Sequence, residues 1–283
     1  MFLCFFRGED FRKDFKKIGE DLLPLLPSVQ VMLFTATAPP SVRDQILSNL
    51  GIKEARIIEV NPDRANIQYR KELRPPSKDS KDHLDNIISK LAEELKEKKG
   101  KFPQTIVYTD LAYIGYCYWK TELILGDEQY IGEAAVENRI FAQYHSEYTD
   151  DMKQTIVSEL CKEISKLRLV FATVALGMGL DAPHVRRVIH YGAPTSMEKY
   201  FQETGRAGRD NVYAVAVLFY NNTDLRSNRP GISKSIVEYC KVDDQCLREC
   251  MLSYFGYMPP ANRAKHACCS NCNPYMKDIL MQM

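Results

Sequence analysis

The sequence lacks the features that mark a membrane or secreted protein. No apolar run approaches the ~18 residues that a membrane span requires. The apolar opening, residues 1–6, is too short for a secretory signal and is followed by charged residues. Without such a signal, nine cysteines in a chain of 283 residues indicate reduced thiols or metal ligands, and they argue against a disulfide framework.

The sequence also has almost no net charge. Lys and Arg total 38 and Asp and Glu total 37, which gives a formal net charge of +1 at pH 7. A global basic field is therefore absent, and any nucleic-acid surface must be a local patch. A hydrophobic content of 45% is enough for one large domain or two modest ones.

Short apolar runs alternate with helical patterns along the middle of the chain. The runs predict β-strands at residues 31–34, 105–108, 141–144, 169–171, 188–191 and 213–220. Strand and helix alternate through residues 66–220, which predicts an α/β fold with a parallel sheet flanked by helices. In such a fold the loops at the carboxyl ends of the strands carry the function.

The most informative stretch is residues 168–210. A glycine-punctuated loop follows an apolar strand, and Ser196 can then cap a helix that carries Gln202, Arg206 and Arg209. These three side chains lie on one helical face if the helix persists through two intervening glycines. Two guanidinium groups presented together suit a polyphosphate, although a surface helix with a few arginines is the simpler alternative.

The whole stretch resembles motifs V and VI of superfamily 2 helicases in their RecQ form. Residues 172–179, ATVALGMG, follow A-T-x-A-F-G-M-G with Leu176 in the place of Phe, and residues 202–210, QETGRAGRD, match motif VI. Residues 35–38, TATA, resemble motif III. The resemblance implies the second RecA-like lobe of an ATP-dependent DNA helicase.

This resemblance implies catalytic roles for three residues. Arg209 corresponds to the arginine finger that stabilises charge on the transferring γ-phosphate. Arg206 corresponds to its phosphate or interlobe partner, and Gln202 helps to order the two arginines. Asp181 and Gly179 correspond to the nucleotide side of the site.

Four further residues are implied to meet DNA or to couple it to the ATP state. They are Thr35, Thr37, Thr173 and His145. A hydrogen-bonded loop histidine is the alternative for His145.

The phosphate-binding half of such a motor is missing from the 283 residues. No G-x-x-x-x-G-K-[ST] segment and no DEAH or DExH segment occurs. Residues 1–52 are interpreted as a C-terminal remnant of the first lobe and residues 53–221 as the second lobe. ATP and Mg²⁺ would bind only with the missing first lobe, so we expect no ATP hydrolysis by this polypeptide alone.

A cysteine cluster near the C-terminal end has the spacing of a zinc site. Cys269 and Cys272 form a C-x-x-C pair, and Cys246 supplies a distant third thiolate. The fourth ligand is Cys268 or, as in bacterial RecQ proteins, His266. Reduced cysteines without a metal are the alternative.

The sequence around these cysteines resembles the RecQ zinc-binding subdomain. Residues 246–257 resemble its C-R-R-x-x-L-L-x-Y-F-G, with Leu247 and Met251 in the place of Arg and Leu, and the subdomain is placed at residues 222–283. Zinc would be structural here, so we expect a chelator to unfold residues 232–275 first.

Two functions remain open. One is the C-terminal motor half of a 3′–5′ DNA helicase that acts on single-stranded and fork-like DNA in repair and recombination. The other is a non-catalytic fragment that binds DNA or a partner. The nucleus is expected from the family, with the cytosol as the alternative, no membrane association is expected, and the sequence does not indicate the oligomeric state.

Overall fold

A computed structural model describes the protein at residues 17–26, 29–35, 38–76, 80–177, 180–258, 268–273 and 275. The chain divides into two compact units. One comprises Met1–Asp63 and Leu252–Met258, and the other comprises Arg64–Met251 and Pro259–Met283. The predicted boundaries after residues 52 and 221 stay predictions. Among the described residues, no helix has the length and apolar character needed to cross a membrane.

The first unit contains helix α2 (Pro40–Asn49), preceded by the short turns Ile18–Leu22 and Leu23–Leu25. Prolines at the start of α2 fit its first turn, where backbone N–H groups have no partner within the helix. The strand predicted at residues 31–34 is wrong, because this segment is irregular. A strand needs a neighbour for its hydrogen bonds, and the described residues of this unit contain none.

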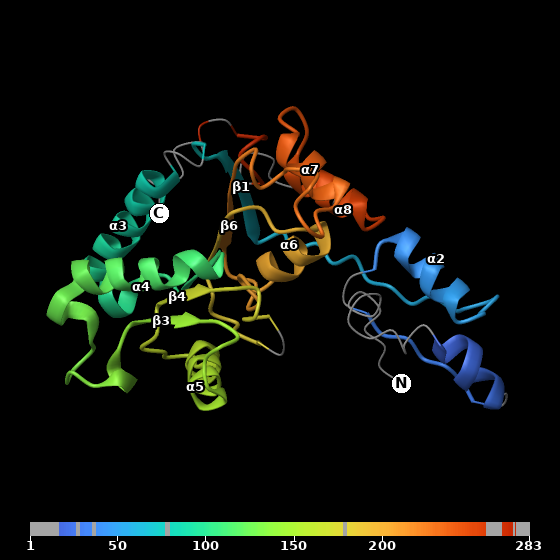
Figure 1. Ribbon diagram of the computed structural model, residues 1–283, viewed down its shortest axis with the longest axis horizontal. Coiled ribbons are helices and arrows are strands. Elements are labelled where there is room, and N and C mark those ends of the chain that lie inside the picture. Colours follow the sequence, from blue (N-terminus) through green and yellow to red (C-terminus); the bar gives the residue numbers. More distant parts are fainter. Residues whose placement is uncertain are drawn as a thin grey trace. The chain divides into compact units, whose positions relative to one another are not determined.

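The second unit is built on a six-stranded sheet in the order β1-β6-β5-β2-β4-β3 (Figure 1). Every neighbouring pair is parallel, so the predicted parallel sheet is confirmed. The strands are β1 (Ile67–Leu73), β2 (Thr105–Thr109), β3 (Phe141–Tyr144), β4 (Leu169–Ala172), β5 (Arg187–Tyr191) and β6 (Ala214–Tyr220).

Helices cover both faces of this sheet. The helices that follow β1 in the chain are α3 (Ser80–Lys98), α4 (Leu111–Leu125), α5 (Asp150–Cys161), α6 (Met197–Thr204), α7 (Lys234–Lys241) and α8 (Leu247–Tyr254), with short 3-10 turns at Lys99–Lys101, Gly126–Gln129 and Val136–Asn138. Helices α3 and α4 lie together on one side of the sheet (Figure 1), and their apolar side chains form one core with alternate residues of the strands. On the other face, Tyr200 of α6 lies edge-on to His190 of β5, with ring centroids 5.3 Å apart.

The strand register brings the loops of interest to one edge of the sheet. Because the strands are parallel, the segments that follow β3, β4 and β5 all leave from the same edge. Tyr144 pairs with Ala172 at the ends of β3 and β4, so the next residues of both strands are neighbours. This edge carries Thr173 and His145, two of the residues singled out from the sequence.

Candidate functional site

Thr173 and His145 follow two adjacent strands. The backbone N–H of Thr173 donates to the carbonyl of Tyr144 at 3.0 Å, and its Oγ1 accepts from the N–H of Ala175 at 3.3 Å. The ring of His145 stacks at an angle against Tyr148, with centroids 4.4 Å apart. The two predicted DNA-side residues therefore start neighbouring loops at the carboxyl edge.

Helix α6 begins as the sequence predicts. Ser196 is its N-cap, and the Ser196 hydroxyl accepts from the N–H of Lys199 at 3.4 Å. This bond satisfies one of the donors that the first turn leaves unpaired.

The end of α6 differs from the prediction. The helix stops at Thr204, so Gln202, Arg206 and Arg209 do not share one helical face. Beyond Thr204 the N–H groups of Arg206 and Ala207 donate three residues back, and Gly208, with a left-handed φ of +58°, donates to the carbonyl of Val185 at 2.7 Å. A glycine in this conformation turns the chain out of the helix.

Arg206 is buried beneath the loop that follows β4. Only 6% of the residue is exposed. Its Nη1 donates to the carbonyl of Leu180 at 3.4 Å, and its Nη2 donates to the carbonyl of Gly177. The guanidinium thus joins the turn after α6 to the loop after β4.

Arg209 lies nearer the surface and pairs with Asp181. Its Nη1 donates to Asp181 Oδ1 at 2.7 Å, and the two side chains are 33% and 83% exposed. Its Nε donates to the carbonyl of Gly205 at 3.5 Å. The structure therefore brings together two residues that the sequence assigned to the site, while Gln202 is exposed on α6.

Three predicted site residues lie outside the described residues: Thr37, Gly179 and His266. Thr35 is described and exposed, and it belongs to the other compact unit.

A buried polar brace behind Arg206 was not predicted. His190 Nε2 and Glu203 Oε2 lie 2.8 Å apart, and the His190 ring stacks on Tyr108 with centroids 5.1 Å apart. The Tyr108 hydroxyl donates to the carbonyl of Leu176 at 3.0 Å, and burial raises the pKa of Tyr108. The available signal was a histidine in an otherwise apolar strand, since a buried polar group needs a partner.

Asp210 forms a second unpredicted connection next to Arg209. Arg186 donates to both of its carboxylate oxygens, at 3.0 Å through Nη1, and His184 Nδ1 lies 3.3 Å away. Hydrogen bonding from Arg186 lowers the pKa of Asp210 to about 2. This ionised carboxylate fixes the end of the turn that carries both arginines.

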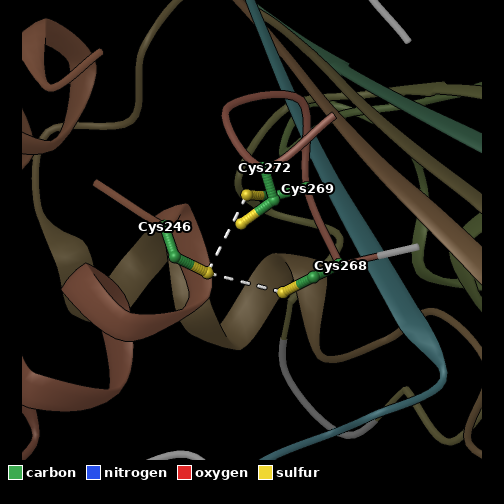
Figure 2. Close-up of side chains that lie close together, drawn as sticks. All are labelled: Cys246, Cys268, Cys269 and Cys272. Atoms are coloured by element: carbon green, nitrogen blue, oxygen red, sulfur yellow. Dashed lines mark hydrogen bonds between the residues drawn. The ribbon is translucent and has the colours of Figure 1, made fainter. Parts of the chain in front are cut away.

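Four cysteines converge at a separate site on the same unit (Figure 2). Their sulfur atoms all lie within 4.8 Å of one another, with Cys246 Sγ 3.5 Å from Cys268 Sγ and 3.9 Å from Cys269 Sγ. Four sulfurs each about 2.3 Å from a zinc ion would lie about 3.8 Å apart at the corners of a tetrahedron. Cys246, Cys268, Cys269 and Cys272 therefore fit a metal such as zinc.

The surroundings of the cluster supply hydrogen-bond donors to two of the sulfur atoms. The N–H of Leu247 donates to Cys269 Sγ at 3.4 Å, and Arg248 Nε donates to Cys268 Sγ at 3.3 Å. Hydrogen bonds among the thiols lower the pKa of Cys269 and raise that of Cys268, and burial raises the pKa of Cys272. Metal binding requires deprotonated sulfur, so these donors suit a metal site.

The cysteine loop is attached directly to β1. The N–H of Tyr69 donates to the carbonyl of Cys268 at 3.1 Å, and the N–H of Ser270 donates to the carbonyl of Tyr69 at 2.9 Å. Lys71 Nζ donates to the carbonyl of Cys240 at 2.8 Å at the end of α7. The cluster and the sheet therefore form one structural unit.

Residues 86–211 match the family described as helicase conserved C-terminal domain. The chain is 28% identical over 282 residues to the ATP-dependent helicase SGS1 of Saccharomyces cerevisiae. The alignment covers 94% of this chain and 18% of that protein. It is 29% identical over 283 residues to the ATP-dependent DNA helicase RecQ of Bacillus subtilis. This alignment covers 94% of this chain and 42% of that protein. The chain thus spans less than half the length of both relatives.

The fold is similar to that of a solved structure, S. cerevisiae Dbp5 bound to RNA and ADP BeF3. The TM-score is 0.56 at 16% identity, over 97% of this chain and 59% of that one. At this identity the similarity concerns the fold alone.

Proposed function

The chain is a RecQ-like member of helicase superfamily 2, and on this premise we propose that it forms the C-terminal part of an ATP-dependent DNA helicase motor. The motor moves 3′ to 5′ and unwinds DNA during repair and recombination in the nucleus. The observation that carries this proposal is Arg209, held by Asp181 in a turn that packs against the residues just before β5.

Arg209 is proposed as the arginine finger. Its side chain is 33% exposed, so the guanidinium can reach a γ-phosphate that another lobe presents. Arg206 supports it from below by holding the loop after β4, and Gln202 orders the outer side of the turn. Asp181 and Gly179 form the nucleotide side of the site.

The nucleic-acid partner is proposed to be DNA, in single-stranded and fork-like form. Thr173 and His145 start neighbouring loops and can contact one stretch of backbone. Thr35 and Thr37 couple that contact to the ATP state. Because phosphate contacts dominate such binding, the affinity should fall steeply with salt.

The cysteine cluster is proposed to hold a structural zinc ion. Cys246, Cys268, Cys269 and Cys272 supply a closed set of sulfur ligands, and a closed set leaves no position for a substrate. When bound, zinc would cross-link the start of α8 to the loop beside β1.

A second reading is a non-catalytic module that binds DNA or a partner. In this reading the chain binds without hydrolysing ATP, because an arginine finger without a phosphate cradle has no reaction to assist. On either reading the polypeptide alone should release phosphate from ATP at the background rate.

The test joins the chain to the phosphate-binding first lobe of the B. subtilis relative and measures DNA-stimulated phosphate release. Arg209→Ala should lower the rate by about 10³- to 10⁵-fold. The matched control is Arg226→Ala, because Arg226 is exposed in the connection before α7. A rate within tenfold of the unsubstituted chimera would reject Arg209 as the finger, and an inactive chimera with intact DNA binding would favour the second reading.

A further inference from the structure

Arg248 is a buried arginine whose guanidinium contacts the cysteine cluster and the sheet at once. Its Nε donates to Cys268 Sγ at 3.3 Å. Its Nη1 donates to the carbonyl of Arg64 at 2.7 Å, and its Nη2 donates to the carbonyl of Ile67. Only 3% of the residue is exposed, so these contacts exchange little with water.

The strand contributes a fourth contact. The guanidinium carbon of Arg248 lies 5.2 Å from the centre of the Tyr69 ring. Tyr69 is also the residue whose backbone pairs with Cys268 and Ser270. One side chain therefore reaches both the metal loop and the first residues of β1.

The charge of a metal-bound cluster explains why an arginine would contact the Cys268 sulfur. Four thiolates around a divalent ion carry a net charge of about −2, and a buried charge requires compensation. A cation that donates a hydrogen bond to a ligand sulfur supplies this charge compensation. It also fixes the direction in which the sulfur points. Groups in this outer position influence metal retention strongly.

We propose that Arg248 is a positioning residue of the metal site, which orients Cys268 and transmits metal occupancy to β1. This inference rests on the proposal that the four cysteines hold zinc. When the metal is bound, the guanidinium fixes the sulfur and the carbonyls of Arg64 and Ile67 in one arrangement. When the metal leaves, Cys268 is released and the start of β1 loses a restraint.

Arginine suits this role better than lysine. Its planar group offers several N–H donors in fixed directions, so it can serve one sulfur and two carbonyls together. A lysine in its place would keep the charge but would present a single nitrogen. The Arg248→Lys variant therefore separates the charge of the group from its geometry.

The experiment uses the full 283-residue chain loaded with Co²⁺, whose sulfur-to-metal charge-transfer band reports thiolate coordination. Transfer of the metal to a colorimetric chelator is followed below the unfolding temperature for the unsubstituted chain, Arg248→Met, Arg248→Lys and Arg226→Met. Hydrogen exchange of the β1 amides is measured on the same samples with and without metal. Arg226 is the control because it is exposed.

We expect Arg248→Met to release Co²⁺ about 10- to 100-fold faster than the unsubstituted chain, with a shifted charge-transfer band. Arg248→Lys should release it at least about fivefold faster, and it carries the test if the methionine variant does not fold. Arg226→Met should behave as the unsubstituted chain, and metal removal should speed exchange at the start of β1.

The two proposals fail in different ways. Release rates for both Arg248 variants within twofold of the unsubstituted chain would overturn the role of Arg248 and leave the zinc proposal intact. An unsubstituted chain that develops no charge-transfer band with Co²⁺ would overturn the metal proposal and this inference with it.

Discussion

Arg209 and Asp181 form an ion pair of 2.7 Å between the turn after α6 and the segment that follows β4. Asp181 is 83% exposed, so water screens the pair and its contribution to stability is small. The pair instead determines where the Arg209 guanidinium points. The direction of the Arg209 guanidinium can therefore be changed with little effect on the stability of the fold.

Asp181→Asn should therefore change activity more than stability. The free energy of unfolding should change by less than about 1 kcal/mol in urea. DNA-stimulated phosphate release by the chimera should fall by about 10- to 100-fold, because a misplaced guanidinium stabilises the transition state poorly. A loss of stability above about 2 kcal/mol with unchanged phosphate release would contradict this assignment.

Removing the carboxylate of Glu203 should lower stability, in contrast to Asp181→Asn, which should mainly lower activity. Glu203→Ala leaves His190 buried without its 2.8 Å partner, which should cost about 2 to 4 kcal/mol of unfolding free energy. The control is Glu238→Ala, whose exposed pair with Lys234 should contribute less than about 0.5 kcal/mol. Equal effects of the two variants would mean that the brace behind Arg206 carries no stability.

Gly208→Ala should destabilise the chain strongly. The residue has φ +58°, and an added Cβ would lie 2.4 Å from Asn66 Nδ2. We expect a loss of about 2 to 4 kcal/mol, from the unfavourable backbone and the clash. Gly115→Ala is the matched control within α4, where a Cβ meets nothing within 4 Å, and it should stabilise by about 0.5 to 1 kcal/mol. Thermal unfolding of both variants distinguishes these outcomes.

Asp210 should make stability depend on pH in acid. Its pKa is lowered to about 2, below the ~3.9 of an unfolded chain, so the folded state gains stability from it above about pH 4. That gain is lost as the pH falls from about 4 to 2. Asp210→Asn lacks it, so its unfolding free energy in urea should decline less over this window. An identical decline in both proteins would show that the contact with Arg186 does not affect stability.

Loss of one cluster cysteine should remove the metal, whereas loss of a nearby cysteine should not. Cys269→Ser breaks the sulfur set, while Cys250 lies outside it and contacts Gln245. Metal content by mass spectrometry should fall below one tenth of the unsubstituted level only in Cys269→Ser, because three remaining thiolates bind zinc weakly. Protease should then cut first within residues 232–275, and Cys250→Ser serves as the control for folding.

Local patterns in the sequence predicted much of this structure. The apolar runs at residues 105–108 and 141–144 correspond to β2 and β3, and Ser196 caps its helix as expected. Such features depend on neighbours in the chain, so spacing is sufficient to find them. The parallel sheet followed because strands and helices alternate.

The features that the sequence did not predict depend on contacts between segments that are distant in the chain. The helical face expected for Gln202, Arg206 and Arg209 fails because Gly208 bonds to Val185, a residue that precedes β5. The brace of His190 and Glu203 joins a strand to a helix, and neither residue alone signals the pairing. The hydrogen bonds of Arg248 reach from α8 to the start of β1, across most of the chain.

The loop that holds Cys268 to Ser270 occupies the free side of β1, the first strand in the sheet order. An uncovered outer strand offers unpaired backbone groups to any other extended chain. At Tyr69 both groups that face this side are taken by the loop, so β1 is shielded there from pairing with a second molecule. The opposite outer strand, β3, spans only Phe141–Tyr144. The cysteine loop, besides carrying candidate metal ligands, therefore caps the outer strand of the sheet at Tyr69.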